Sequence, residues 1–296
     1  MLQPSHIPDV RQRNILAIAP FEMDSLEVVD FVTGSIRDRN TKHDAKCDSL
    51  CVSSSLDLVS GIDRALMMFE DMDPVLLVRL ASALLSYSDG EEEGRFLDFM
   101  NRLPKRLDDL GVHQLSRLLF RVYTSRVVSG ELKDRLLVEG LKRVVEIAGS
   151  GPLPPRVVAK LCVSATRIDD LSLWIFLENQ IKFVVNDLES DQLQQIVYSS
   201  FTKCSEPVQK SLCEKCILIS PISQNEKTYV GLLISLFYSS MHQPYMNQFC
   251  QIFRGHFAIP QVGYISLSKL EKSFSNKFTS KQLRTVRNAL NTTRVY

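Results

Sequence analysis

The chain has 296 residues, 45% of them hydrophobic and 23% charged, with 12 glycines and 12 prolines, a composition that excludes wholesale disorder and collagen-like or low-complexity scaffolds. Its 35 basic residues almost balance 34 acidic ones, for a formal charge of +1, so no global positive field draws it to nucleic acid or to an anionic membrane. The longest apolar stretch, residues 229–238, is far shorter than the ~20 residues that cross a bilayer, so no membrane contact is expected.

The first residues, 1–55, are expected to form an irregular N-terminal extension. Their second part, Arg37 to Ser55, is polar. Pro4, Pro8 and Pro20 interrupt the start, which contains no apolar block of secretory-signal length. An organellar presequence stays open, because the first twenty residues hold two arginines against one acid.

From Leu56 onward, over residues 56–296, the sequence repeats a pair of amphipathic helices. Apolar residues recur at spacings of three and four, which is typical of helices and not of strands. In each pair the second helix opens with an apolar residue followed three positions later by Leu or Ile, and this later residue marks six units: Leu80, Leu118, Leu161, Ile196, Leu232 and Leu270. Successive marks lie 38, 43, 35, 36 and 38 residues apart. The period predicts an all-α fold, an α-solenoid of about six helix-turn-helix repeats, with a bundle of unrelated helices as the alternative.

Helix start signals lie where this repeat needs them. Asp73 before Pro74 is typical of an N-cap followed by proline at the first helical position. Similar signals occur at three further places: Ser205 before Pro207, and the capping-box pairs Ser223 with Glu226 and Thr279 with Gln282. Breaks between helices are expected at four stretches: 88–93, 149–155, 189–191 and 220–225.

Seven cysteines, an odd number, favour a reducing compartment over a disulfide framework. Cys213 and Cys216 form a CxxC that can supply half of a zinc site. No second CxxC or HxxxH follows, and both residues lie in a helix-like run, so we expect core thiols instead. Cys47 and Cys51, near His43, lie in a polar, loop-like stretch with the same lack of further ligands. No metal and no cofactor are predicted.

Motifs of catalysis are absent. The chain has no GxxxxGK(S/T), GxGxxG, HExxH or GxSxG pattern, and its five histidines are dispersed. The acid pairs Asp108–Asp109 and Asp169–Asp170 lie at predicted helix ends, where the helix dipole accounts for them. We therefore expect no catalytic residue, no small-molecule substrate and no enzymatic activity.

Basic charge is concentrated at the C-terminal end. Residues 261–296 hold seven Lys and Arg against a single Glu, a net charge of +6. On the last predicted helix Leu283, Val286 and Leu290 form the inward stripe, while basic residues recur every three positions on a neighbouring face. A row of cations at this spacing can follow a phosphate backbone, and the candidate RNA-binding residues are Lys269, Lys272, Lys277, Lys281, Arg284 and Arg287. The alternative is a terminal helix that is basic for solubility and for its own dipole.

Two tyrosines 35 residues apart open successive units near the C-terminus, within the set Thr228, Tyr229, Leu232, Leu233, Pro260, Tyr264 and Leu267. These units resemble the opening of pentatricopeptide repeats. The wider pattern from Leu56 to Phe274, about three quarters of the chain, is similar to heptatricopeptide and octotricopeptide repeats, including those related to the FAST-kinase group. The resemblance implies a mitochondrial or plastid protein that binds RNA within a ribosome or an RNA-processing assembly. No RAP domain follows the repeats in this sequence.

The residues that read bases in pentatricopeptide repeats are replaced here. The matching positions are Val230, Pro260 and Ile265, and none of their side chains can donate a hydrogen bond, so one-base-per-repeat readout is not expected. We expect a non-enzymatic subunit of a mitochondrial ribonucleoprotein, with the mitochondrial ribosome the most concrete candidate, or a cytoplasmic protein if the presequence is absent. Its partners would be RNA, such as rRNA, and proteins of the same complex. The alternative is a HEAT- or TPR-like scaffold that binds proteins.

Overall fold

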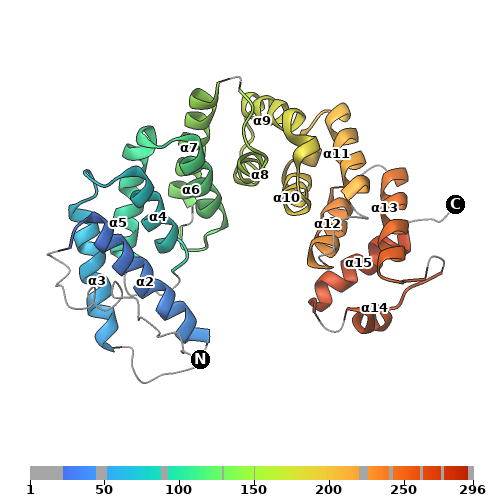
Figure 1. The fold of residues 1–296 in the computed structure, drawn as a ribbon, viewed down its shortest axis with the longest axis horizontal. Coiled ribbons are helices and arrows are strands. Elements are labelled where there is room, and N and C mark those ends of the chain that lie inside the picture. Colours follow the sequence, from blue (N-terminus) through green and yellow to red (C-terminus); the bar gives the residue numbers. More distant parts are fainter. Residues whose placement is uncertain are drawn as a thin grey trace, which may run out of the picture. The chain divides into compact units, whose positions relative to one another are not determined.

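A computed structural model describes the residues 23–44, 52–87, 93–128, 130–149, 151–219, 226–239, 243–260, 263–274 and 277–292. All regular secondary structure within these ranges is helical, which confirms the predicted all-α class. The chain divides into two compact units, Met1–Ile147 (unit 1) and Ala148–Tyr296 (unit 2). Figure 1 shows the helices of both units, coloured along the sequence.

The described residues of unit 1 form six α-helices and one 3-10 helix. They are α2 (Ser25–Asp44), α3 (Val52–Met67), α4 (Pro74–Leu84), α5 (Glu93–Arg102), η4 (Leu103–Asp109), α6 (Val112–Thr124) and α7 (Gly130–Ala148), whose last residue already belongs to unit 2. Helix α2 packs on α3 and α4, α4 packs on α6, and α3 packs on α5. The helices form because their buried leucines, valines and phenylalanines fall on one face, as at Leu115, Leu118, Leu119 and Val122 of α6.

The expectation of an irregular N-terminal extension is wrong for Ser25–Asp44. These residues form α2, whose Val28, Val32 and Ile36 are at most 2% exposed. Their spacing of four is a helical signal, and the helix continues into the polar stretch that begins at Arg37. Helix α3 begins at Val52, so the boundary expected after residue 55 falls inside a helix. Cys47 and Cys51 lie outside the described residues.

Unit 2 contains two sets of packed helices. The first set, which we call the first row, comprises α8 (Pro155–Ser164), α10 (Ser190–Ser200), α12 (Glu226–Tyr238) and α15 (Ser280–Thr292), each packed on the next. The second set comprises α9 (Leu171–Val184), α11 (Glu206–Ile219) and α13 (Gln243–His256), also packed in sequence (Figure 1). Three short helices complete the described part of the unit: η5 (Val185–Asp187), η6 (Phe201–Lys203) and α14 (Leu267–Ser273).

All six residues that marked the repeat are at most 2% exposed, on α4, α6, α8, α10, α12 and α14. The last of them departs from the pattern. Leu270 lies on α14, which has only 7 residues and packs on α15, whereas α15 itself takes the next place on α12. The sixth marker residue therefore lies on a helix outside the first row, and α15, which continues the row, carries no marker residue. A continuous α-solenoid through both units stays a prediction.

Two of the predicted helix starts are confirmed. The Asp73 carboxylate accepts a hydrogen bond from the Val75 backbone N–H at 2.8 Å, with Pro74 opening α4. At α15 the Gln282 side chain accepts from the Thr279 backbone N–H at 2.9 Å, and the Thr279 hydroxyl accepts from the Gln282 backbone N–H at 3.3 Å, which is a reciprocal capping box. Ser223 lies outside the described residues.

The predicted cap at Ser205 has a different role. Its backbone N–H and its hydroxyl both donate to the Glu178 carboxylate of α9, at 2.8 and 2.6 Å, and Lys182 donates to the same carboxylate at 2.9 Å. Burial raises the pKa of this carboxyl, but the hydrogen bonds from Lys182 and Ser205 outweigh burial and bring it to about 2. Glu178 therefore links the start of α11 to α9.

Because the folded pKa of Glu178 lies below its ordinary value, its contribution to stability is present above about pH 5 and is lost as the pH falls towards 2. We expect the free energy of unfolding of the wild type to fall by about 2 kcal/mol more than that of Glu178→Gln over this range. Urea titrations at pH 6 and pH 3, followed by the fluorescence of the single tryptophan, Trp174, in unit 2, measure the difference. Parallel acid sensitivity in both proteins would contradict this role.

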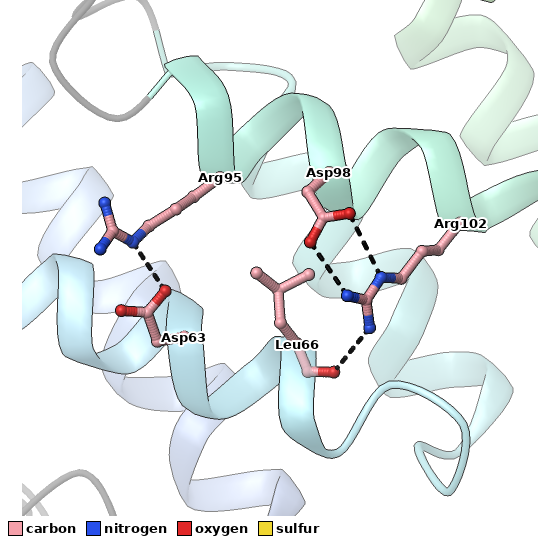
Figure 2. Close-up of polar contacts among 5 residues, drawn as sticks. All are labelled: Asp63, Leu66, Arg95, Asp98 and Arg102. Atoms are coloured by element: carbon pink, nitrogen blue, oxygen red, sulfur yellow. Dashed lines mark hydrogen bonds and ion pairs between the residues drawn. The ribbon is translucent and has the colours of Figure 1, made fainter.

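Basic side chains of one helix reach the end of an earlier one. In unit 1, Arg95 of α5 pairs with Asp63 of α3 at 2.6 Å, and Arg102 donates to the Leu66 carbonyl of α3 at 3.2 Å while pairing with Asp98 at 3.0 Å (Figure 2). The last carbonyls of a helix have no intrahelical donor, and a cation there also complements the helix dipole. Such contacts hold consecutive helix pairs together.

Arg106 of η4 is the most complete example. It is 9% exposed, and its guanidinium donates to the carbonyls of Phe69, Glu70 and Met72 in the turn that follows α3. It also pairs with Asp109. Sequence reasoning gave this arginine no role, because a charged residue in a polar segment carries no sign that it will be buried.

Candidate nucleic-acid interface

Helix α15 carries the basic residues that recur every three positions. As predicted, Leu283, Val286 and Leu290 face inward and are at most 1% exposed. Lys281 and Arg284 are exposed, and Arg287 is half-buried with one N–H donating to Asn288 at 3.2 Å. No carboxylate in the described residues pairs with any of the three, so their charge is directed to solvent.

Helix α14 adds two more of the predicted cations. Lys269 and Lys272 are exposed, and α14 packs directly on α15. Lys277, in the segment between these helices, pairs instead with Glu226 of α12 at 3.1 Å, which offsets its charge. Five of the six predicted residues therefore share one pair of contacting helices, and the sixth belongs to an ion pair.

The position of α15 is set by a buried arginine and a cluster of aromatic rings. Arg254 of α13 is 3% exposed and donates to the Leu290 carbonyl of α15 at 2.8 Å and to the Pro260 carbonyl. Burial lowers the pKa of this guanidinium, which nevertheless stays charged. Phe253, also on α13, lies 6.3 Å from the ring of Phe274, which follows α14. These contacts tie both basic helices to α13.

Sequence reasoning missed a second basic surface in the same unit. Arg156 is exposed and Lys160 is half-buried, and their spacing of four residues places both on one face of α8. Arg167, in the turn after α8, is exposed as well. Helix α8 contains no acidic residue. Unit 2 as a whole holds 16 basic and 10 acidic residues, whereas unit 1 holds 19 and 24. The near-neutral chain therefore has a basic half.

The positions that match the base-reading residues of pentatricopeptide repeats do not form a reading face. Val230 and Ile265 are each 1% exposed, so neither can touch a base. Pro260 is exposed, but its side chain has no hydrogen-bonding group. The two tyrosines of that resemblance also differ, because Tyr229 is buried against His256 and Tyr264 is 73% exposed. Any RNA contact in this unit must use other residues.

Cys213 and Cys216 are both buried in α11. Burial raises the pKa of Cys213 to about 12 and that of Cys216 well above its ordinary value, so both are neutral thiols at pH 7. The described residues contain no group of three or more His, Cys, Asp or Glu placed to hold a metal ion. The surroundings of this CxxC are those of packed core thiols.

The two acid pairs have structural contacts. Asp108 pairs with Arg143 at 3.3 Å and Asp109 pairs with Arg106. Asp169 pairs with Lys203 at 3.0 Å, and Asp170 accepts a hydrogen bond from the Leu173 backbone N–H as the N-cap of α9.

Among the described helices, none combines the length and apolarity needed to span a membrane.

The fold thus defines an all-α protein of packed helices, and the exposed cations on α14 and α15 have no carboxylate partner among the residues that the structure describes. No family model matches the sequence, and a search of curated proteins finds no match.

Proposed function

We propose that the protein is a non-enzymatic, RNA-contacting subunit of a mitochondrial ribonucleoprotein, with the mitochondrial ribosome as the leading candidate, and that its helix pairs form an α-solenoid. The observation that carries the RNA contact is the set of exposed cations on α14 and α15 without carboxylate partners in the described residues. Phosphate contact is the main source of affinity in such sites and carries no sequence information. The compartment and the ribosome rest on the resemblance of the repeats alone.

A salt titration tests the RNA contact. Each cation that neutralises a phosphate of a single strand adds about 0.7 to the dependence of log affinity on log salt. We expect Lys281→Gln with Arg284→Gln to lower this slope by about 1.4 and to weaken binding of a fluorescein-labelled RNA of 20 nucleotides. Fluorescence anisotropy between 50 and 200 mM KCl measures both quantities.

The matched control removes two exposed lysines elsewhere, Lys142→Gln on α7 and Lys210→Gln on α11. It changes the net charge by the same amount, and we expect it to leave the slope unchanged. Equal effects of the two double variants would mean that net charge, not this surface, attracts RNA. Absence of RNA binding at 50 mM KCl would refute the proposed contact.

A protein-binding scaffold is the second candidate, and one surface favours it. Leu171, Ile175 and Phe183 of α9 are 76%, 54% and 58% exposed, and Leu218 of the adjacent α11 is 63% exposed. Exposed apolar side chains grouped on neighbouring helices are typical of protein-binding surfaces. Cross-linking in mitochondrial lysate that joins α9 and α11 to protein, with no RNA attached to α15, would support this function over the first.

A further inference from the structure

Two exposed tyrosines lie on the first row of unit 2, between its two basic helices. Tyr198 of α10 is 63% exposed and Tyr238 of α12 is 57% exposed, and these two helices pack directly on each other. Each ring lies on the exposed face of its helix. Tyr198 lies seven residues, or about two turns, after the exposed Asp191, and Tyr238 lies eleven residues, or about three turns, after the exposed Lys227. The Tyr238 hydroxyl lies 3.4 Å from the Thr285 hydroxyl of α15, which orients this ring towards the basic helix.

A glutamine and a glycine lie between the tyrosine-bearing helices. A Cβ atom added to Gly231 of α12 would collide with the side-chain amide of Gln194 on α10, so this amide rests directly on the Gly231 backbone. The half-buried amide makes no hydrogen bond to another described residue. A side-chain amide offers two donors and one acceptor oxygen, which can pair with the edge of a nucleobase.

Cations flank this surface on both sides. Helix α8, which packs on α10, carries Arg156 and Lys160, with Arg167 in the turn that follows it, and α15, which packs on α12, carries Lys281 and Arg284. With neighbouring helices ~8–10 Å apart, the path from α8 to α15 is about 25–30 Å long. Asp191 is the acid nearest in sequence to Tyr198, and it lies about 10 Å away along the axis, at the other end of α10.

We propose that the first row of unit 2 binds single-stranded RNA across its helices. Two unpaired bases stack on Tyr198 and Tyr238, Gln194 contacts a base edge between them, and the cations of α8 and α15 contact the phosphates on either side. Aromatic rings bind bases of any sequence by stacking, but only when the bases are not already stacked in a duplex. The inference rests on the proposed RNA contact and adds to it the strand state of the ligand and the residues that recognise bases.

The test uses the full chain with a fluorescein-labelled uridine 12-mer and a duplex RNA of equal length. We expect Tyr198→Leu and Tyr238→Leu each to weaken single-strand binding about tenfold, to spare duplex binding, and to leave the salt slope unchanged. Tyr198→Phe keeps a ring and should keep the affinity. Tyr264→Leu is the matched control, because Tyr264 is 73% exposed but precedes α14 and lies outside the row.

The outcomes separate this inference from the function on which it rests. If both leucine variants bind the uridine 12-mer as tightly as the wild type while Lys281→Gln with Arg284→Gln weakens binding, base stacking is overturned and the phosphate contact stands. Equal losses for single strand and duplex would also overturn it. If the wild type binds no RNA, both proposals fail. The Trp174 fluorescence transition in urea verifies that each variant is folded.

Discussion

Replacing Arg106 with Met is expected to lower the free energy of unfolding of unit 1 by about 3 kcal/mol. The guanidinium donates to three carbonyls in the turn that follows α3, two of them through buried contacts. A methionine of similar length fills the space but donates nothing, so these carbonyls lose charge-assisted hydrogen bonds. Urea unfolding followed by circular dichroism measures the loss, and amide hydrogen exchange locates it.

Two further variants sharpen this prediction. Lys105→Met changes the exposed neighbour of Arg106 in the same 3-10 helix and should cost less than about 0.5 kcal/mol. Arg106→Lys keeps the charge but cannot reach three carbonyls with a planar fork, so we expect an intermediate loss. If Arg106→Met is as stable as Lys105→Met, the arginine does not join η4 to the turn after α3 as the contacts indicate.

Replacing Phe253 with Ala is expected to destabilise unit 2 by about 3–5 kcal/mol. The Phe253 side chain is 0% exposed, and its ring lies 4.8 Å from that of Phe257, 6.2 Å from Tyr229 and 6.3 Å from Phe274. Truncation leaves a cavity where α12, α13 and the segment after α14 meet. Trp174, the only tryptophan in the chain, reports the urea transition of this unit.

The conservative variant Phe253→Leu should cost less than half as much, because most of the volume is kept. At urea concentrations where Phe253→Ala is still folded, its RNA affinity should match that of the wild type, since Phe253 touches no solvent. A loss below about 1 kcal/mol for Phe253→Ala would show that the cluster collapses around the gap and does not hold α14 in place.

Helical periodicity determined the class of this protein and much of its local structure. The spacing of three and four residues predicted helices. The side chains of Asp73 and Thr279 cap α4 and α15, as their residue types predicted. The same spacing predicted the inward stripe of Leu283, Val286 and Leu290. These features depend on contacts between residues near in sequence, so a local pattern contains the information.

Polar side chains had roles that no local pattern contained. Ser205 bonds to Glu178, which lies 27 residues earlier, instead of capping its own helix. Arg106 and Arg254 are buried because carbonyls 34–37 residues away in sequence need donors. A charged residue is predicted to be exposed unless its partner is known. Because these partners are distant in sequence, the sequence alone does not predict the contacts.

The sequence by itself determined the helices, their approximate period and the excess of positive charge near the C-terminus. Only the tertiary structure decided which cations stay unpaired: Lys277 meets Glu226 across 51 residues, whereas Lys281 and Arg284 face solvent. It likewise placed Tyr198 and Tyr238 on contacting helices between two basic ones. The physical reason is that the availability of a charge or a ring depends on what packs beside it, and in this all-α protein that neighbour often comes from a helix distant in the sequence.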